Sequence, residues 1–188
     1  MILDIRREGR VTGSMAGAAM GVNQYTSRQK AFRLITKREV FEGNDFTKWG
    51  NDHEADAILA YEAFTGSLVD KANENQEFIL FGEFGVTPDG FCDGVYIEAK
   101  CPQNIPDAVP DHYMAQVQLG MQASDSLLCD LIYWTEDDLV IFEIERSEEY
   151  WAAALPLLEE FNEYLAKDEQ PARKKKPILP EVKTRIIT

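Results

Sequence analysis

The segment from Gly85 to Pro102, GVTPDGFCDGVYIEAKCP, constrains the fold of this chain more than any other stretch. The pair Asp93-Gly94 is typical of a two-residue β-hairpin turn, and the apolar, β-branched run that follows it predicts a strand. Asp89 lies in a Pro-Asp-Gly turn before this hairpin. We therefore expect two carboxylates, those of Asp89 and Glu98, to meet across the width of the hairpin.

The residues near these carboxylates indicate a type of chemistry. Glu98 and Lys100 are two positions apart on a strand, so their side chains point to the same face. Two adjacent carboxylates repel each other, and a divalent cation such as Mg²⁺ relieves that repulsion. A lysine beside a metal-bound water can orient the water, or help to deprotonate it if its surroundings lower the lysine pKa. The pattern predicts a metal-dependent nuclease centre.

A simpler interpretation of the same residues stays open. An acid and a lysine separated by one residue are common on strands, where they mark a solvated face. The preceding Pro-Asp-Gly turn, at a distance that a hairpin can close, favours the catalytic interpretation.

Periodicity along the rest of the chain predicts alternating helices and strands. We expect helices at 14–22, with Ser14 as N-cap, at 27–39, 49–64 and 112–124, and a long helix capped by Ser147 and kinked at Pro156. Strands are expected at 77–84, 95–100, 127–135 and 139–145. This order predicts an α/β fold with a central mixed β-sheet flanked by helices. We assign residues 1–170 to one domain and 171–188 to a tail.

The charge of the chain is strongly negative and unevenly distributed. A net charge of −14 argues against a nonspecific nucleic-acid binder, which needs lysine and arginine to neutralise phosphates. The tail 171–188, rich in proline and lysine, nevertheless carries six basic residues and one acid. It could bind DNA, dock on a neighbouring subunit, or be disordered.

The sequence predicts a cytoplasmic protein that does not enter a membrane. Its first residues, MILDIRREGR, lack the apolar core of a signal peptide, and no run approaches the ~20 apolar residues of a membrane span. The three cysteines, Cys92, Cys101 and Cys129, are odd in number and form no C-x-x-C pair, so they predict no disulfide framework.

Four blocks of the sequence together resemble one family. REGRVTGS is similar to R-x-G-x-x-T-[AG]-S, and WGNDHEADA is similar to G-x-x-x-E-x-x-A. GVTPDGF with VYIEAKCP resembles the core [ST]-P-D-G followed by E-x-K-C-P, and YMAQVQLGM resembles Y-x-x-Q-x-Q-x-x-M. These blocks resemble the phage-type recombination exonucleases, the lambda exonuclease and YqaJ-type viral recombinase group. That group has a PD-(D/E)XK nuclease-like core.

The resemblance implies roles for the residues that match its motifs. Asp89 and Glu98, helped by the backbone carbonyl of Ala99, would bind Mg²⁺, for which Mn²⁺ can substitute. Lys100 would position or activate the attacking water. Glu54 would contact metal-bound water from its helix.

The resemblance also implies a phosphate pocket. The 5′-phosphate of a DNA end would be bound by Arg7, Ser14 and Thr87. Gln116, on the helix beside the site, would hold the metal–water network. A guanidinium and hydroxyls suit a phosphate, and a helix N-terminus near Ser14 adds a favourable dipole.

The activity that the resemblance implies is a Mg²⁺-dependent 5′→3′ exonuclease on linear double-stranded DNA. It would leave 3′ overhangs for a single-strand annealing partner in phage-type recombination. Members of the family form a trimeric ring around DNA, and a phage or prophage origin in a bacterial host would follow. Two alternatives stay open: an endonuclease of the same superfamily, and a DNA-binding scaffold without catalysis.

Overall fold

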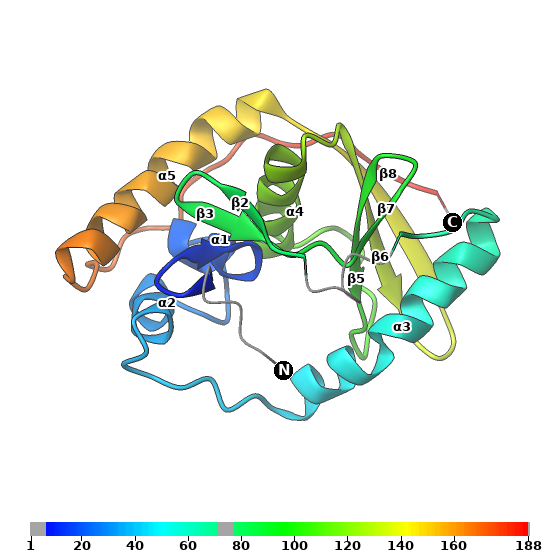
Figure 1. Ribbon diagram of the computed structural model, residues 1–188, viewed down its shortest axis with the longest axis horizontal. Coiled ribbons are helices and arrows are strands. Elements are labelled where there is room, and N and C mark those ends of the chain that lie inside the picture. The colour runs from blue at the N-terminus through cyan, green and yellow to red at the C-terminus, as the bar shows by residue number, and fades with distance from the viewer. Residues whose placement is uncertain (1–6, 71–76, 188) are drawn as a thin grey trace.

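A five-stranded mixed sheet forms the centre of the computed structural model, which describes residues 7–70 and 77–187 (Figure 1). Its strand order is β4-β5-β6-β7-β8. The only parallel pair among these neighbours is β5 with β6. The strands are β4 (Gly90–Cys92), β5 (Val95–Lys100), β6 (Leu128–Trp134), β7 (Leu139–Glu145) and β8 (Thr184–Ile186). The predicted α/β class with a mixed sheet flanked by helices is confirmed.

Two helices cover opposite faces of this sheet (Figure 1). Helix α3 (Asp45–Thr65) packs on the face that carries Ile97 and Ala99, and α4 (Asp111–Ser124) packs on the face that carries Tyr96. Successive residues of β5 thus alternate between two apolar cores, as strand geometry requires. Glu98 and Lys100 follow Tyr96 by two and four residues, so their side chains point to the same face of the sheet, toward α4.

A second, smaller sheet lies beside the first and has its own helices. Its strand order is β1-β3-β2, formed by β1 (Val11–Thr12), β3 (Phe84–Val86) and β2 (Ile79–Phe81). The helices α1 (Gly13–Met20), α2 (Arg28–Ile35) and α5 (Glu148–Lys167) pack with it into a third apolar core. The single strand predicted at 77–84 is wrong: Gly82, with φ +57°, turns the chain between β2 and β3.

The N-cap predicted at Ser147 is confirmed for α5. Ser27 is the N-cap of α2, and Gly66 ends α3. The N-cap predicted at Ser14 is wrong, because Thr12 is the N-cap and Ser14 is the second residue of α1. Helix α5 continues across Pro156. None of the helices in the described ranges is both long and apolar enough to cross a membrane.

The tail returns to the domain and completes the sheet. Its strand β8 pairs with β7 in antiparallel register, with Arg185 opposite Glu143. Four of its basic side chains make ion pairs with acids of the domain: Lys174 with Glu160, Lys176 with Asp111, Lys183 with Glu145 and Arg185 with Glu143. Much of the positive charge of the tail is thus directed at this chain itself.

Candidate active site

One cavity of about 320 Å³ brings together most of the predicted site residues. It opens where the N-terminus of α1, the middle of α3, the end of β3 and the strand β5 meet. Its lining includes seven of the predicted residues: Arg7, Ser14, Glu54, Thr87, Asp89, Glu98 and Gln116. Lys100 and Ala99 do not line it, but both are bonded to carboxylates that do.

The hairpin positions Asp89 as the sequence predicts. Asp93 and Gly94 form its turn with positive φ values, and β4 pairs with β5 through Gly90 opposite Ile97. One step further, the same register places Asp89 opposite Glu98.

Asp89 is bonded to β5 through both its backbone and its side chain. Its backbone N–H donates to the carbonyl of Ile97 at 3.2 Å, and its Oδ2 accepts the N–H of Ala99 at 2.7 Å. Burial raises the pKa of Asp89 well above its usual value, and the nearby carboxylates of Glu98 and Glu54 raise it further. Burial and these neighbouring carboxylates therefore favour the protonated form of Asp89 in the metal-free protein.

Three donors from three positions hold the carboxylate of Glu98, whose side chain is almost fully buried. Lys100 Nζ and Gln116 Nε2 both donate to Oε1, each at 2.5 Å. The hydroxyl of Tyr96 donates to Oε2 at 3.2 Å. A buried carboxylate needs such partners, because leaving it unpaired costs several kcal/mol (on the order of 2–5). The strand and α4 thereby fix the direction in which Glu98 points.

The surroundings of Lys100 do not lower its pKa, which is the condition for it to help deprotonate a water. Burial lowers its pKa, but the charges of Glu98 and Asp89 and the hydrogen bond to Glu98 outweigh burial, so the pKa lies above its usual value. Its ammonium also lies 5.1 Å from the ring centroid of Tyr113. In the metal-free protein Lys100 is therefore a cation that balances part of the acidic charge.

The other end of the cavity presents hydrogen-bond donors. The Arg7 guanidinium donates to the hydroxyl of Thr87 and lies over the ring of Phe78 at 5.4 Å. Its Nε is buried and has no hydrogen-bond partner among the described residues. Ser14 lies in the first turn of α1, where backbone N–H groups point outward, and its Oγ is 3.4 Å from that of Thr12. This grouping suits an anion.

The donor set at the acidic end fits a hard divalent cation. Mg²⁺ commonly takes one or two carboxylates and completes its octahedral shell with water and phosphate oxygens. Asp89 and Glu98 supply two carboxylates on one side of the cavity, next to the backbone of Ala99. Within the described residues, no cluster of three or more His, Cys, Asp or Glu side chains forms a metal centre.

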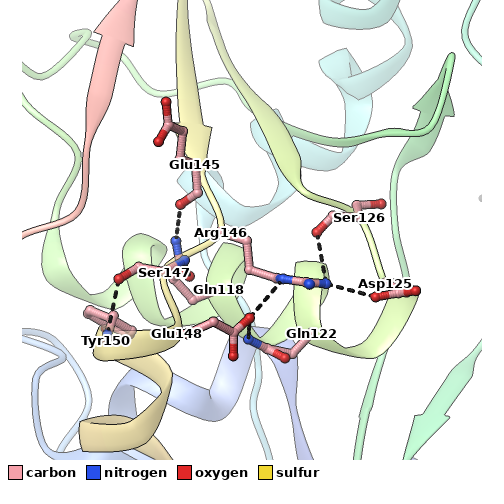
Figure 2. Close-up of polar contacts among 9 residues, drawn as sticks. All are labelled: Gln118, Gln122, Asp125, Ser126, Glu145, Arg146, Ser147, Glu148 and Tyr150. Atoms are coloured by element: carbon pink, nitrogen blue, oxygen red, sulfur yellow. Dashed lines mark hydrogen bonds and ion pairs between the residues drawn. The ribbon is translucent and has the colours of Figure 1, made fainter.

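A polar network around the buried Gln118 joins α4 to the connection between β7 and α5 (Figure 2). The side-chain amide of Gln118 donates to the carbonyl of Glu145 and accepts the N–H of Ser147, each at 2.9 Å. Arg146 bonds Asp125, at the end of α4, at 2.9 Å. Helix α4 is therefore attached to the connection between β7 and α5 near both its middle and its C-terminus.

Sequence reasoning missed three polar residues that line the cavity: Thr12, Asn51 and Tyr96. Spacing could have found two of them. Asn51 is one helical turn before Glu54, and Tyr96 is two strand positions before Glu98. The position of the Tyr96 ring also requires a glycine at residue 120, because a Cβ added there would lie only 2.5 Å from the ring.

Comparison with solved structures places this fold among known exonucleases. The alkaline exonuclease LHK-Exo from Laribacter hongkongensis, also solved with dAMP, is 23% identical, with a TM-score of 0.71 over 86% of this chain and 90% of that one. A phage related exonuclease from Haemophilus somnus 129PT is 16% identical, with a TM-score of 0.66 over 84% of this chain and 94% of that one. These likenesses confirm the fold.

The sequence comparisons identify the family. No curated protein sequence matches the chain. The YqaJ-like viral recombinase domain matches residues 3–126, which include every predicted site residue and all four motif blocks. The chain therefore belongs to the family of the YqaJ-like viral recombinase domain.

Proposed function

We propose that this protein is a Mg²⁺-dependent 5′→3′ exonuclease that digests one strand of linear double-stranded DNA. One observation carries the proposal. A donor-rich end, with Arg7 and Thr87, and an acidic end, with Asp89 and Glu98, share one cavity of about 320 Å³. A terminal phosphate bound at the first end would leave a nearby phosphodiester bond at the second.

Each residue then has a defined task. Arg7, Thr87 and Ser14 bind the 5′-phosphate, since the unpartnered Nε of Arg7 and the first turn of α1 both supply donors. Asp89, Glu98 and the carbonyl of Ala99 hold the cation. Bound there, Mg²⁺ (or Mn²⁺) supplies a water of lowered pKa and neutralises charge on the phosphodiester.

The remaining residues orient the reactants around that cation. Lys100 would direct the attacking water with its ammonium, which already donates to Glu98 at 2.5 Å. Gln116 holds the Glu98 carboxylate in place, and Glu54 would accept a hydrogen bond from a water of the bound cation.

The phosphate pocket favours an end-dependent enzyme over the two alternatives. An endonuclease of the same superfamily has no use for a group that reads a terminal phosphate. A non-catalytic scaffold has no use for two carboxylates and a lysine in one hydrogen-bonded set, which burial makes costly to keep.

The proposal extends to assembly and partners. A homo-oligomeric ring, a trimer as in the family, would let a chain of net charge −14 stay on DNA by enclosing it, with few basic residues. The 3′ overhang would pass to a single-strand annealing protein, in the cytoplasm of a bacterial host that carries a phage or prophage.

The test compares three substrates with Mg²⁺ present: linear duplex DNA with 5′-phosphate ends, the same duplex with 5′-hydroxyl ends, and a closed circle. The proposal expects rapid loss of the phosphorylated duplex, slower loss of the hydroxyl form and an intact circle. Cutting of the circle would favour the endonuclease, and binding without any cleavage would favour the scaffold.

A further inference from the structure

A second cavity, of about 300 Å³, lies on the part of the molecule formed by α2, α5 and the tail. It shares no lining residue with the candidate active site. Four cationic side chains line it: Arg28, Arg173, Lys174 and Lys175. Three of them are consecutive in the basic tail of a chain whose net charge is −14.

Arg28 is built into the wall of this cavity. Its side chain is only 6% exposed, which is rare for arginine. Its stem packs against Gly21, where an added Cβ would come within 3.4 Å of Cδ, and its guanidinium lies 5.7 Å from the ring of Phe161. One nitrogen, Nη2, pairs with Glu160 at 3.2 Å. Packing, more than that single ion pair, holds the guanidinium in place.

A donor of Arg28 is left without an acceptor. Its Nε is buried and has no hydrogen-bond partner among the described residues. A buried donor without a partner is unfavourable, and the residue that carries it lines the cavity. The same wall includes Ser27, the N-cap of α2, so the positive end of that helix faces the same region.

The tail supplies three of the four cations that line the cavity. Gln29 bonds the carbonyl of Pro171 at 3.1 Å, which holds the tail against α2. Lys174 pairs with Glu160, but Arg173 and Lys175 form no ion pair with a described residue. Glu160 itself does not line the cavity. The lining itself contains no acid, although Glu160 behind it pairs with two of the four cations, Arg28 and Lys174.

We propose that this cavity is a second binding site, for a phosphate group, separate from the pocket at Arg7. Arginine nitrogens, a helix N-terminus and flanking cations are the groups that bind phosphate in proteins. The phosphate can come from a DNA backbone or from a free phosphate or mononucleotide. The inference rests on Arg28 and the tail, and it does not depend on cleavage.

The test follows the Nε–H resonance of Arg28 by NMR in the full-length, metal-free protein. Inorganic phosphate, a 5′-mononucleotide and a single-stranded oligodeoxynucleotide with a 5′-hydroxyl are titrated separately. We expect a saturable shift of this resonance with at least one of them. Tighter, salt-dependent binding of the oligonucleotide would identify the DNA backbone as the source, and binding of only the small ligands would identify free phosphate.

Two double variants make the test specific. Arg173→Gln with Lys175→Gln removes two lining charges and should weaken binding about tenfold. Lys30→Gln with Lys167→Gln removes the same charge from outside the cavity and should leave the affinity unchanged. Arg7→Ala should also leave it unchanged, which separates this site from the proposed end pocket. Absence of a saturable shift, or equal weakening by the two double variants, would overturn the proposal.

Discussion

Asp89 and Ala99 are joined by a 2.7 Å hydrogen bond from the backbone N–H of Ala99 to Oδ2 of Asp89. This bond connects the turn before β4 to β5 near the C-terminal end of the strand, so it links the two acidic positions of the site through the backbone. It also explains why the spacing between Asp89 and Glu98 matters. The hairpin turn at Asp93-Gly94 sets the register, and the register sets the distance between the carboxylates.

Replacement of Asp89 by asparagine should separate catalysis from folding. The amide oxygen of the new side chain can still accept the N–H of Ala99, but the charge that binds a cation is lost. We expect cleavage of linear duplex DNA to fall by at least about a hundredfold. The free energy of unfolding should stay level or rise by up to about 1 kcal/mol, because repulsion with Glu98 and Glu54 is removed.

The matched control is Asp93→Asn in the hairpin turn. Asparagine tolerates the positive φ of this position, and Asp93 does not line the cavity. Gel-based cleavage and thermal unfolding of both variants measure the two effects. Wild-type activity in Asp89→Asn would show that the site is assigned wrongly.

Thr87→Val should reduce the preference for a 5′-phosphate. The hydroxyl that contacts Arg7 is lost, while the shape of the side chain is nearly kept. The ratio of rates on 5′-phosphate and 5′-hydroxyl duplexes should fall about tenfold, since one hydrogen bond to a charged group is removed. The hydroxyl duplex serves as the internal control. An unchanged ratio, with both rates lowered equally, would argue against a phosphate pocket here.

Gln118→Met should destabilise the protein because it breaks the network in Figure 2. The carbonyl of Glu145 and the N–H of Ser147 would both lose their partner at a fully buried position. We expect a loss of about 2–4 kcal/mol in urea unfolding. Gln122→Met, on the exposed part of the same helix, should change stability by less than about 0.5 kcal/mol. Equal effects of the two variants would contradict this account of the network.

Asp130 should make stability depend on pH in a predictable direction. Burial raises the pKa of this carboxyl above its usual value, despite a 2.7 Å hydrogen bond from the hydroxyl of Tyr61. The folded state then binds the proton more tightly than the unfolded state. The contribution of Asp130 to stability is therefore largest at low pH, and it decreases as pH rises from the usual aspartate pKa through the raised value.

Asp130→Asn removes this titration but keeps an acceptor for Tyr61. Relative to wild type, the variant should become progressively more stable as pH rises through that window, and the difference should then level off. Urea unfolding of both proteins between about pH 4 and 7 measures it. Parallel stability curves would contradict the direction given for the Asp130 pKa.

The sequence predicted those elements whose residues carry local information. The strand at 139–145 and the cap Ser147 follow from periodicity and from capping chemistry. The turn at Gly82 was missed because a run of apolar and aromatic residues surrounds it and hides the break. Strand β8 was missed because its three residues are exposed, so its pairing depends on β7 and on the ion pair between Arg185 and Glu143.

The site was predictable where sequence motifs and register coincide. Asp89, Glu98 and Gln116 converge because a hairpin and a facing helix hold them, which spacing can indicate. The protonation of Lys100 was not predictable, since it results from the balance between burial and two nearby carboxylates. Arg28 was not predictable as a buried residue either, because the tail and α5 that enclose it are distant in sequence.

The central claim is that cleavage starts at a phosphorylated 5′ end and proceeds along that strand. The most direct measurement follows a duplex whose one strand carries different labels at its 5′ and 3′ ends, with Mg²⁺ and with EDTA. A 5′→3′ exonuclease that needs Mg²⁺ releases the 5′ label first as a mononucleotide and leaves the 3′ label in long products, and EDTA stops the reaction. Release of the 3′ label first, or internal cuts that separate the labels at once, would contradict it.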